Sequence, residues 1–152
     1  MRERQAVLDR IGSDAAIAAL LDTYGDDGDP AVFSPWKPAD YEWDEAPAVI
    51  IKPPTSVEDA STFRGKTAPE TTGQRSIVLL DVVVYGKMPA DSTDDTVVEA
   101  VAKKIRQLFR GKKFVAPDGL TYQAIASGPI AAPTDSDQMA GYLLQLRLNC
   151  GG

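Results

Sequence analysis

Histidine is absent from this chain of 152 residues, and its absence restricts the chemistry that the protein can perform. Histidine is the side chain most often used as a general base near neutral pH, and it is the commonest metal ligand. Mechanisms that activate a serine or a cysteine with a histidine are therefore excluded. We expect no catalytic residue, no cofactor and no metal site in this protein.

Cysteine occurs once, at Cys150, so no disulfide can form within the chain and nothing marks an oxidising compartment. The first residues, Met1 to Gln5, lack the uninterrupted apolar core of a signal peptide. No apolar run is longer than a strand, so we expect no contact with a membrane. We therefore predict that the protein is located inside a cell. We also predict that Cys150 has no essential chemistry.

Positive charge is in short supply, because 16 Lys and Arg stand against 22 Asp and Glu and give a net charge of -6. Such a chain repels the phosphate backbone of nucleic acid unless its basic residues are concentrated on one face. Direct reading of DNA is therefore disfavoured. An acidic surface that lets DNA pass without binding it is compatible with the same charge.

Two short motifs have the letters of known signatures without the required context. Ser34 to Lys37 matches an S-x-x-K nucleophile motif, which needs a helix that Pro38 prevents. Gly65-Lys66-Thr67 resembles the end of a phosphate-binding loop, but the first glycine of that motif would fall at Ala60. We therefore predict no phosphate site in this chain.

Two segments carry the apolar spacing of amphipathic helices. In the first, Glu3 to Leu21, Gly12 separates either two short helices, the second capped by Ser13, or the halves of one bent helix. The second, Asp94 to Arg110, has acidic residues at its start and basic residues at its end. The residues predicted to be buried are Val7, Leu8, Ile11, Ala15, Ala18 and Leu21 in the first segment, and Val97, Val98, Val101, Ile105, Leu108 and Phe109 in the second.

Strand composition is found in the segments 48–52, 76–85, 114–115 with 120–126 as a hairpin, and 142–149. In the segment 76–85 apolar residues fall on both faces except at Asp81, so we expect a central strand that is covered on both sides. In the last segment apolar residues alternate with residues that include Gln145 and Arg147, which predicts one face on the core and one in solvent.

The order of these elements predicts one domain over residues 1–152, of the α+β class, with a single antiparallel-rich sheet and helices packed on a face. Residues 53–75 are mostly polar and contain proline and glycine, and we predict a long exposed loop there. Loops of that length are usually functional or disordered. We expect this loop to be mobile in an isolated subunit and to order against a partner on assembly.

Candidate contact residues lie in the irregular segment before the first strand and in the long loop. They are Trp36, Tyr41, Trp43, Phe63, Arg64 and Lys66. The first three either cap the core or serve as interface anchors. A basic run at the C-terminal end of the second helix and just beyond it is either a solvated face that complements the helix dipole or a docking patch for an acidic neighbour, and we favour the solvated face. That run consists of Lys103, Lys104, Arg106, Arg110, Lys112 and Lys113.

The order of elements and three stretches of sequence resemble the tail-terminator, or tail-completion, proteins of long-tailed bacteriophages and gene-transfer agents. The first stretch is the helix Ala6 to Leu21, the link Phe33-Ser34-Pro35 and the strand ending at Ile51. The second is the strand Ser76 to Tyr85 with the helix Asp94 to Phe109. The third is Leu120 to Ala126, then Thr134-Asp135-Ser136-Asp137 and the strand Gly141 to Asn149.

This resemblance implies a structural protein and no enzyme. It implies a hexameric ring of identical subunits that caps the tail tube, stops its polymerisation and joins it to the head-side connector or neck protein. DNA would pass through the lumen without specific binding, and the protein would lie in the tail or neck region of the virion after assembly in the host cytoplasm.

Two alternatives stay open. A head-completion or neck protein of the same particle has the same kind of composition. A small intracellular enzyme is the alternative of a different class, because carboxylates such as Asp81 or Asp118 could converge with another acidic residue in the fold.

Overall fold

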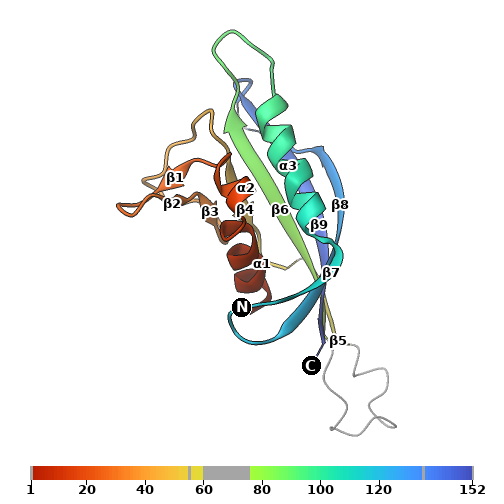
Figure 1. Ribbon diagram of the computed structural model, residues 1–152. Coiled ribbons are helices and arrows are strands. Elements are labelled where there is room, and N and C mark those ends of the chain that lie inside the picture. The colour runs from red at the N-terminus through yellow and green to blue at the C-terminus, as the bar shows by residue number, and fades with distance from the viewer. Residues whose placement is uncertain (1, 55, 60–75, 135, 152) are drawn as a thin grey trace, which may run out of the picture.

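The computed structural model describes residues 2–54, 56–59, 76–134 and 136–151 and shows an α+β fold, as predicted (Figure 1). The helices are α1 (Arg2–Gly12), α2 (Ala15–Ala18) and α3 (Thr96–Leu108). The strands are β1 (Thr23–Tyr24), β2 (Asp29–Pro30), β3 (Val32–Phe33), β4 (Ala48–Ile51), β5 (Ser56–Asp59), β6 (Ser76–Lys87), β7 (Arg110–Val115), β8 (Thr121–Ala131) and β9 (Met139–Gly151). None of the described helices is both long and apolar enough to span a bilayer.

A seven-stranded sheet forms the centre of the molecule, with the order β3-β4-β6-β9-β8-β7 and with β5 paired to β6. Every pairing in this sheet is antiparallel except that of β3 with β4. The longest pairing joins β6 to β9 and places Val82 opposite Leu144. The strands β1 and β2 form a separate antiparallel pair. The predicted antiparallel-rich sheet is therefore confirmed, as is the β7–β8 hairpin.

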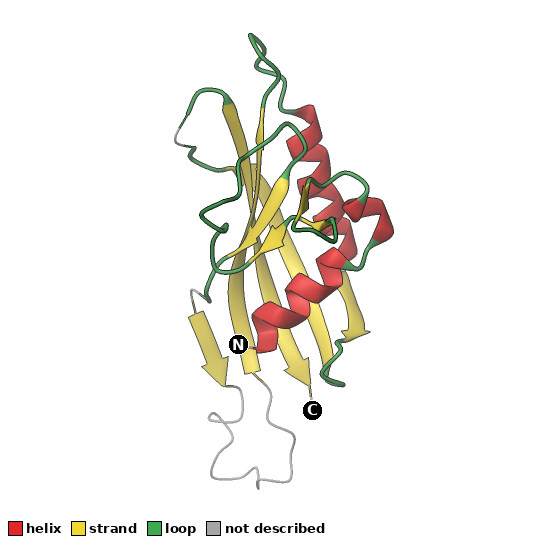
Figure 2. Ribbon diagram, turned by 90° about the vertical axis from the view of Figure 1, so that its left-hand side faces the viewer, coloured by secondary structure: helices red, strands yellow, loops and turns green. Residues whose placement is uncertain are grey.

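The helices cover one face of the sheet, where they bury the apolar side of the two longest paired strands (Figure 2). Alternate residues of a strand point to the same face, which explains why one set of residues in β6 and β9 is fully buried. This core contains Val78, Leu80, Val82 and Val84 of β6, Leu144, Leu146 and Leu148 of β9, Val7 and Ile11 of α1, and Val98, Val101 and Ile105 of α3.

The opposite face of the sheet is covered along only part of its length. A second core packs there around Phe33, Tyr41 and Ile50, with Tyr85 at its border. Further along the sheet, Gln145 and Arg147 of β9 are exposed, and Leu79 of β6 is half-buried. The strand β6 is central, as predicted, but the prediction that it is covered on both sides holds only where this second core lies.

The N-terminal segment forms two helices, and its second half differs from the predicted stripe. Asp14 is the N-cap of α2, and its side chain accepts a hydrogen bond from the Ile17 backbone N at 3.0 Å, so the predicted cap at Ser13 is wrong. Because the chain changes direction after Gly12, the helical phase starts again. Ile17 is buried in place of Ala15, which is exposed.

The helix α3 lies within the predicted bounds, but one residue of its predicted stripe faces solvent. Val97 is 52% exposed, whereas Ala102 is fully buried. Val98 and Val101 define the buried direction, and Val97 lies about 100° away from Val98 around the helix. The prediction that Val97 is buried is therefore wrong.

The segment 53–75, predicted to be a loop, contains the strand β5, which was not predicted. The strand β4 leaves the edge of β6 at the pair Ile51 and Val82, and β5 pairs with the same edge from Leu79 onward. The unpaired backbone groups of β6 beyond β4 offer a template that a short, weakly apolar segment can join. Residues 60–75 lie outside the described part of the chain, so the expected mobility there stays a prediction.

Candidate assembly surfaces

The irregular segment after β3 is held on the second face of the sheet by aromatic rings. Phe33 and Tyr41 have ring centroids 5.0 Å apart, and Tyr41 and Trp43 have centroids 5.6 Å apart, both with edge-to-face geometry. Such pairs stabilise the packing beyond the area that they bury. The prolines exclude a regular element here, and the rings connect the segment to β4 and β6.

The three predicted aromatic contact residues differ in how far they reach into solvent. Tyr41 is 4% exposed, and its hydroxyl donates to Asp22 Oδ2 at 2.8 Å. Burial and that hydrogen bond raise the pKa of the Tyr41 hydroxyl above its ordinary value. Trp43 is half-buried, and Trp36 is 49% exposed. The cluster thus has a buried base and an exposed top.

A cavity of about 330 Å³ opens at this top, and we call it the aromatic slot. Its apolar walls are Trp36, Trp43 and Tyr85, with the Trp43 and Tyr85 centroids 5.3 Å apart. The rest of its lining comes from Lys87 and from the β8–β9 connection at Pro133, Thr134, Ser136, Gln138 and Met139. A slot with aromatic walls and a polar rim suits an apolar or aromatic side chain of a neighbouring protein.

The tryptophans of the slot are fixed by cations. Lys52 Nζ lies 5.3 Å from the Trp36 ring centroid, and Lys37 Nζ lies 5.9 Å from that of Trp43. Lys37 Nζ also donates to the Tyr41 carbonyl at 2.7 Å. These cation–π contacts restrict the orientations that the two tryptophan rings can adopt.

Tyr85 also belongs to this surface and is not among the contact residues predicted from the sequence. It lies at the end of β6, on the face that carries the second core, and its place beside both tryptophans follows from strand pairing. The feature of the sequence that could have indicated Tyr85 is its position as an aromatic residue directly before Gly86. The other predicted contact residues, Phe63, Arg64 and Lys66, lie outside the described residues.

The basic run at the C-terminal end of α3 borders a second cavity, of about 480 Å³, between α3 and β8, which we call the basic groove. Its lining is Lys103, Arg106, Gln107, Phe109, Arg110, Ile125, Ala126 and Pro129. Lys103 forms an ion pair with Glu99 at 2.7 Å. Ile125 is 53% exposed and pairs with Arg110 across β7 and β8, so an apolar surface lies beside the cationic side chains.

A third cavity, of about 920 Å³, lies between α1, the β1–β2 pair and the β7–β8 turn. Asp9 and Asp29 contribute carboxylates to its lining. Asp9 accepts a hydrogen bond from Gln5 at 2.9 Å. Arg10 lies 5.6 Å from the ring centroid of Phe114, across the same opening.

The two carboxylates considered for an enzyme do not converge. Asp118 stabilises the β7–β8 turn, where it accepts from the Leu120 N and the Tyr122 hydroxyl, both at 2.8 Å. Asp81 pairs with Gln145 in the middle of β9, whereas the hairpin that carries Asp118 pairs with the end of β9, about 20 Å further along. Neither carboxylate lines the three cavities, and the described residues contain no group of potential metal ligands.

Comparison with known proteins identifies a solved structure that shares this fold. No protein-family model matches the sequence, and no curated protein matches it. A solved structure described as "Virion of native gene transfer agent (GTA) particle" contains a chain with a TM-score of 0.66 and 21% sequence identity. The match covers 98% of this chain and 94% of that chain. The two chains therefore share one fold over nearly their whole length.

Proposed function

We propose that this protein is a structural component of a phage-like particle, and specifically its tail terminator. In this role a ring of identical subunits caps the tail tube, stops its polymerisation and joins it to the head-side connector. The observation that carries the proposal is the shared fold with a chain of a gene transfer agent virion over nearly the full length of both chains. The order and composition of the elements, which resemble tail terminators, support the more specific role.

The surface of the subunit supports a ring. Large apolar side chains remain exposed at several places that are far apart in the sequence, and such surface is typical of interaction sites. They are Trp36, Val97, Val115, Ile125 and Ile130. A contact between two different patches of the same subunit repeats around an axis, and it closes into a ring when the rotation allows it.

The charge of the chain supports a lumen through which DNA moves. A net charge of -6 disfavours retention of DNA by phosphate contacts, which would hold the genome in the channel. In this proposal the partners are copies of the chain itself, the tail tube protein and the head-side connector, and none of these contacts requires a cofactor.

The aromatic slot provides the test of the proposed ring. We expect Trp36→Ala to weaken ring formation by about tenfold or more, because exposed tryptophans beside a pocket are typical energetic anchors of interfaces. Folding should change little, since about half of the side chain is already in solvent. Native mass spectrometry measures the ring, and thermal unfolding measures the fold.

Trp36→Phe is the matched control, because it retains an aromatic ring at the same position. It should form rings more readily than Trp36→Ala at equal protein concentration. Equal ring formation by the wild-type chain and Trp36→Ala, with both folded, would contradict a contact at the slot.

A further inference from the structure

The basic groove carries more positive charge than its surroundings balance. Lys103 is paired with Glu99, but the other cations around the groove have no ion-pair partner among the residues that the structure describes. Arg106 and Arg110 line the groove, whereas Lys104, Lys112 and Lys113 belong to the same basic run outside its lining, and all five are exposed. Because Ile125 lies exposed next to Arg110, the groove combines an apolar contact area with a cationic rim.

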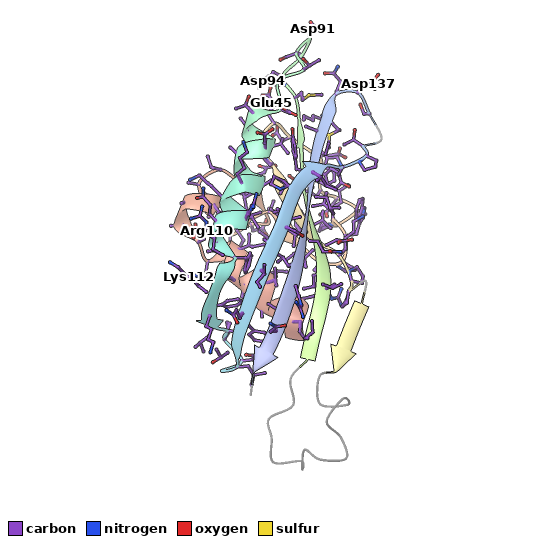
Figure 3. All side chains as sticks on the ribbon, turned by 90° about the vertical axis from the view of Figure 1, so that its right-hand side faces the viewer. Glu45, Asp91, Asp94, Arg110, Lys112 and Asp137 are labelled. Atoms are coloured by element: carbon purple, nitrogen blue, oxygen red, sulfur yellow. The ribbon has the colours of Figure 1, made fainter. Side chains whose placement is uncertain are left out.

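Negative charge collects at the opposite end of α3 (Figure 3). Three loops meet there, because the Lys87 N donates to the Asp44 carbonyl and the Met88 N donates to the Gln138 carbonyl, both at 2.8 Å. We call this region the acidic end. Its exposed carboxylates are Asp44, Glu45, Asp91, Asp94 and Asp137. Val97, which is 52% exposed, lies in the first turn of α3 beside them.

The two regions are too far apart to neutralise each other within one subunit. The helix α3 has 13 residues and separates them by about 20 Å at 1.5 Å per residue. The screening length at physiological ionic strength is about 8 Å. Each region therefore presents its charge to a partner and not to the other end of its own chain.

Complementing the helix dipole explains only part of this distribution. It accounts for Asp94 before α3 and for Arg106 in its last turn. It does not account for Glu45 and Asp137, which lie in loops outside the helix, or for Lys112 in β7. These positions weaken the prediction from the sequence that the basic run is only a solvated face.

We propose that the basic groove of one subunit binds the acidic end of a second copy of this chain, with Val97 of one subunit packed near Ile125 of the other. The inference rests on the proposed function, since it names the contact through which the ring closes. The charges are complementary, and each side offers one exposed apolar residue for the centre of the contact. The aromatic slot borders the acidic end through Lys87 and Gln138, so it faces the same neighbour.

The charges of the two regions also restrict which regions can contact each other. Two grooves repel each other, as do two acidic ends, so a two-fold contact of either region with itself is unfavourable. A groove-to-end contact that repeats around one axis closes into a ring when the rotation allows it, whereas two groove-to-end contacts related by a two-fold axis give a dimer, and the sedimentation coefficient distinguishes the two.

Charge reversal in matched pairs tests this contact. One variant carries Arg110→Glu with Lys112→Glu, and the other carries Glu45→Lys with Asp137→Lys. None of these side chains has a hydrogen-bond or ion-pair partner among the described residues, so both variants should fold. Sedimentation velocity at low and high salt measures self-association, and thermal unfolding checks the fold.

We expect the wild-type chain to associate more strongly at low salt and each variant to associate at least about tenfold more weakly. The two variants mixed in equal amounts should associate again, because each groove then meets an end of opposite charge in an alternating ring. Asp26→Lys with Asp27→Lys, in the turn between β1 and β2, makes the same change in net charge as the acidic-end variant. This control should associate like the wild type.

Three results would overturn the proposal. The first is a wild-type chain that stays monomeric at low salt, and the second is a mixture of variants that fails to associate. The third is salt-dependent binding of duplex DNA that the groove variant loses while its self-association is unchanged, since the groove would then be a nucleic-acid site. If Trp36→Ala disrupts rings and the charge variants do not, this contact is wrong and the proposed ring stands.

Discussion

At the scale of single residues, Gly141 shows how the aromatic slot depends on a small residue in β9. Gly141 lies directly opposite Tyr85 in the pairing of β6 with β9. A Cβ atom at Gly141 would lie 2.8 Å from Tyr85 Cε1 and 3.2 Å from Thr134 Cγ2. The Tyr85 ring has little room to move away, because Trp43 packs against it.

We expect Gly141→Ala to destabilise the fold by about 1–3 kcal/mol, the usual cost of an overpacked core position. The Tyr85 ring must also shift against the tryptophans, so the tryptophan fluorescence of the folded variant should change. Chemical denaturation followed by fluorescence measures both effects.

Gly12→Ala is the control for this substitution, because the Cβ that it adds at the end of α1 meets no atom within 4 Å apart from its chain neighbours and the backbone of its own helix. It should leave stability unchanged or raise it by about 0.5–1 kcal/mol, since alanine favours a helix over glycine. If Gly141→Ala were as stable as Gly12→Ala, with unaltered fluorescence, the tight contact with Tyr85 would be disproved.

The sequence indicated the aromatic cluster, but it did not indicate which of its side chains are buried and which are exposed. Trp36, Tyr41 and Trp43 lie among prolines, and this pattern predicts that they either cap the core or anchor an interface. It does not distinguish one of the three residues from another. Tyr41 is buried because its hydroxyl meets Asp22, and Trp36 is exposed because it lies at the top of the cluster beside Tyr85. Those neighbours are distant in the sequence, so local patterns cannot rank the exposure of the rings.

At the scale of elements, Tyr142 joins β9 to the start of α3. Its hydroxyl donates to Asp95 and lies 3.0 Å from Glu99 Oε2. The hydrogen bond to Asp95, then the burial of the ring, raises the pKa of Tyr142 above its ordinary value of 10.0. The hydrogen bond from Lys103 and, to a smaller extent, the hydrogen bond from Tyr142 lower the pKa of Glu99.

We expect Tyr142→Phe to destabilise the fold by about 1 kcal/mol at neutral pH, through the lost hydrogen bond to carboxylate. Because the folded-state pKa of Tyr142 is raised, its contribution is complete below pH 10.0 and decreases as the pH rises above that value. Urea unfolding across this range should show a stability difference that narrows above pH 10.0. A difference that stays constant or widens there would rule out this role of the hydroxyl.

The elements with strong apolar periodicity were predicted from sequence, and the short ones were not. The strands β6 and β9 and the helix α3 carry their pattern over many residues, so their own composition specifies them. By contrast, β5 exists because β6 leaves an edge unpaired, and β3 exists because it pairs in parallel with β4. Long-range pairing of this kind leaves no local signal, which is why Ser56–Asp59 was assigned to a loop.

At the scale of the whole molecule, the helices cover one face of the sheet and the second face stays open along part of its length. The sequence predicted the α+β class and the helices on a face, because element order restricts the possible layers. It did not predict the positions of the acidic end and the basic groove on the surface. The acidic end arises from three loops that tertiary hydrogen bonds bring together, and its distance from the basic groove is set by the length of α3.

Electron microscopy of tail tubes, assembled from tail tube protein with and without this chain, tests the proposed function most directly. We expect a ring of this chain at one end of each tube and tubes that stop growing when the chain is added. A contradictory result would show the folded chain only as monomers or two-fold dimers, with no ring at any tube end and with tube growth unaffected.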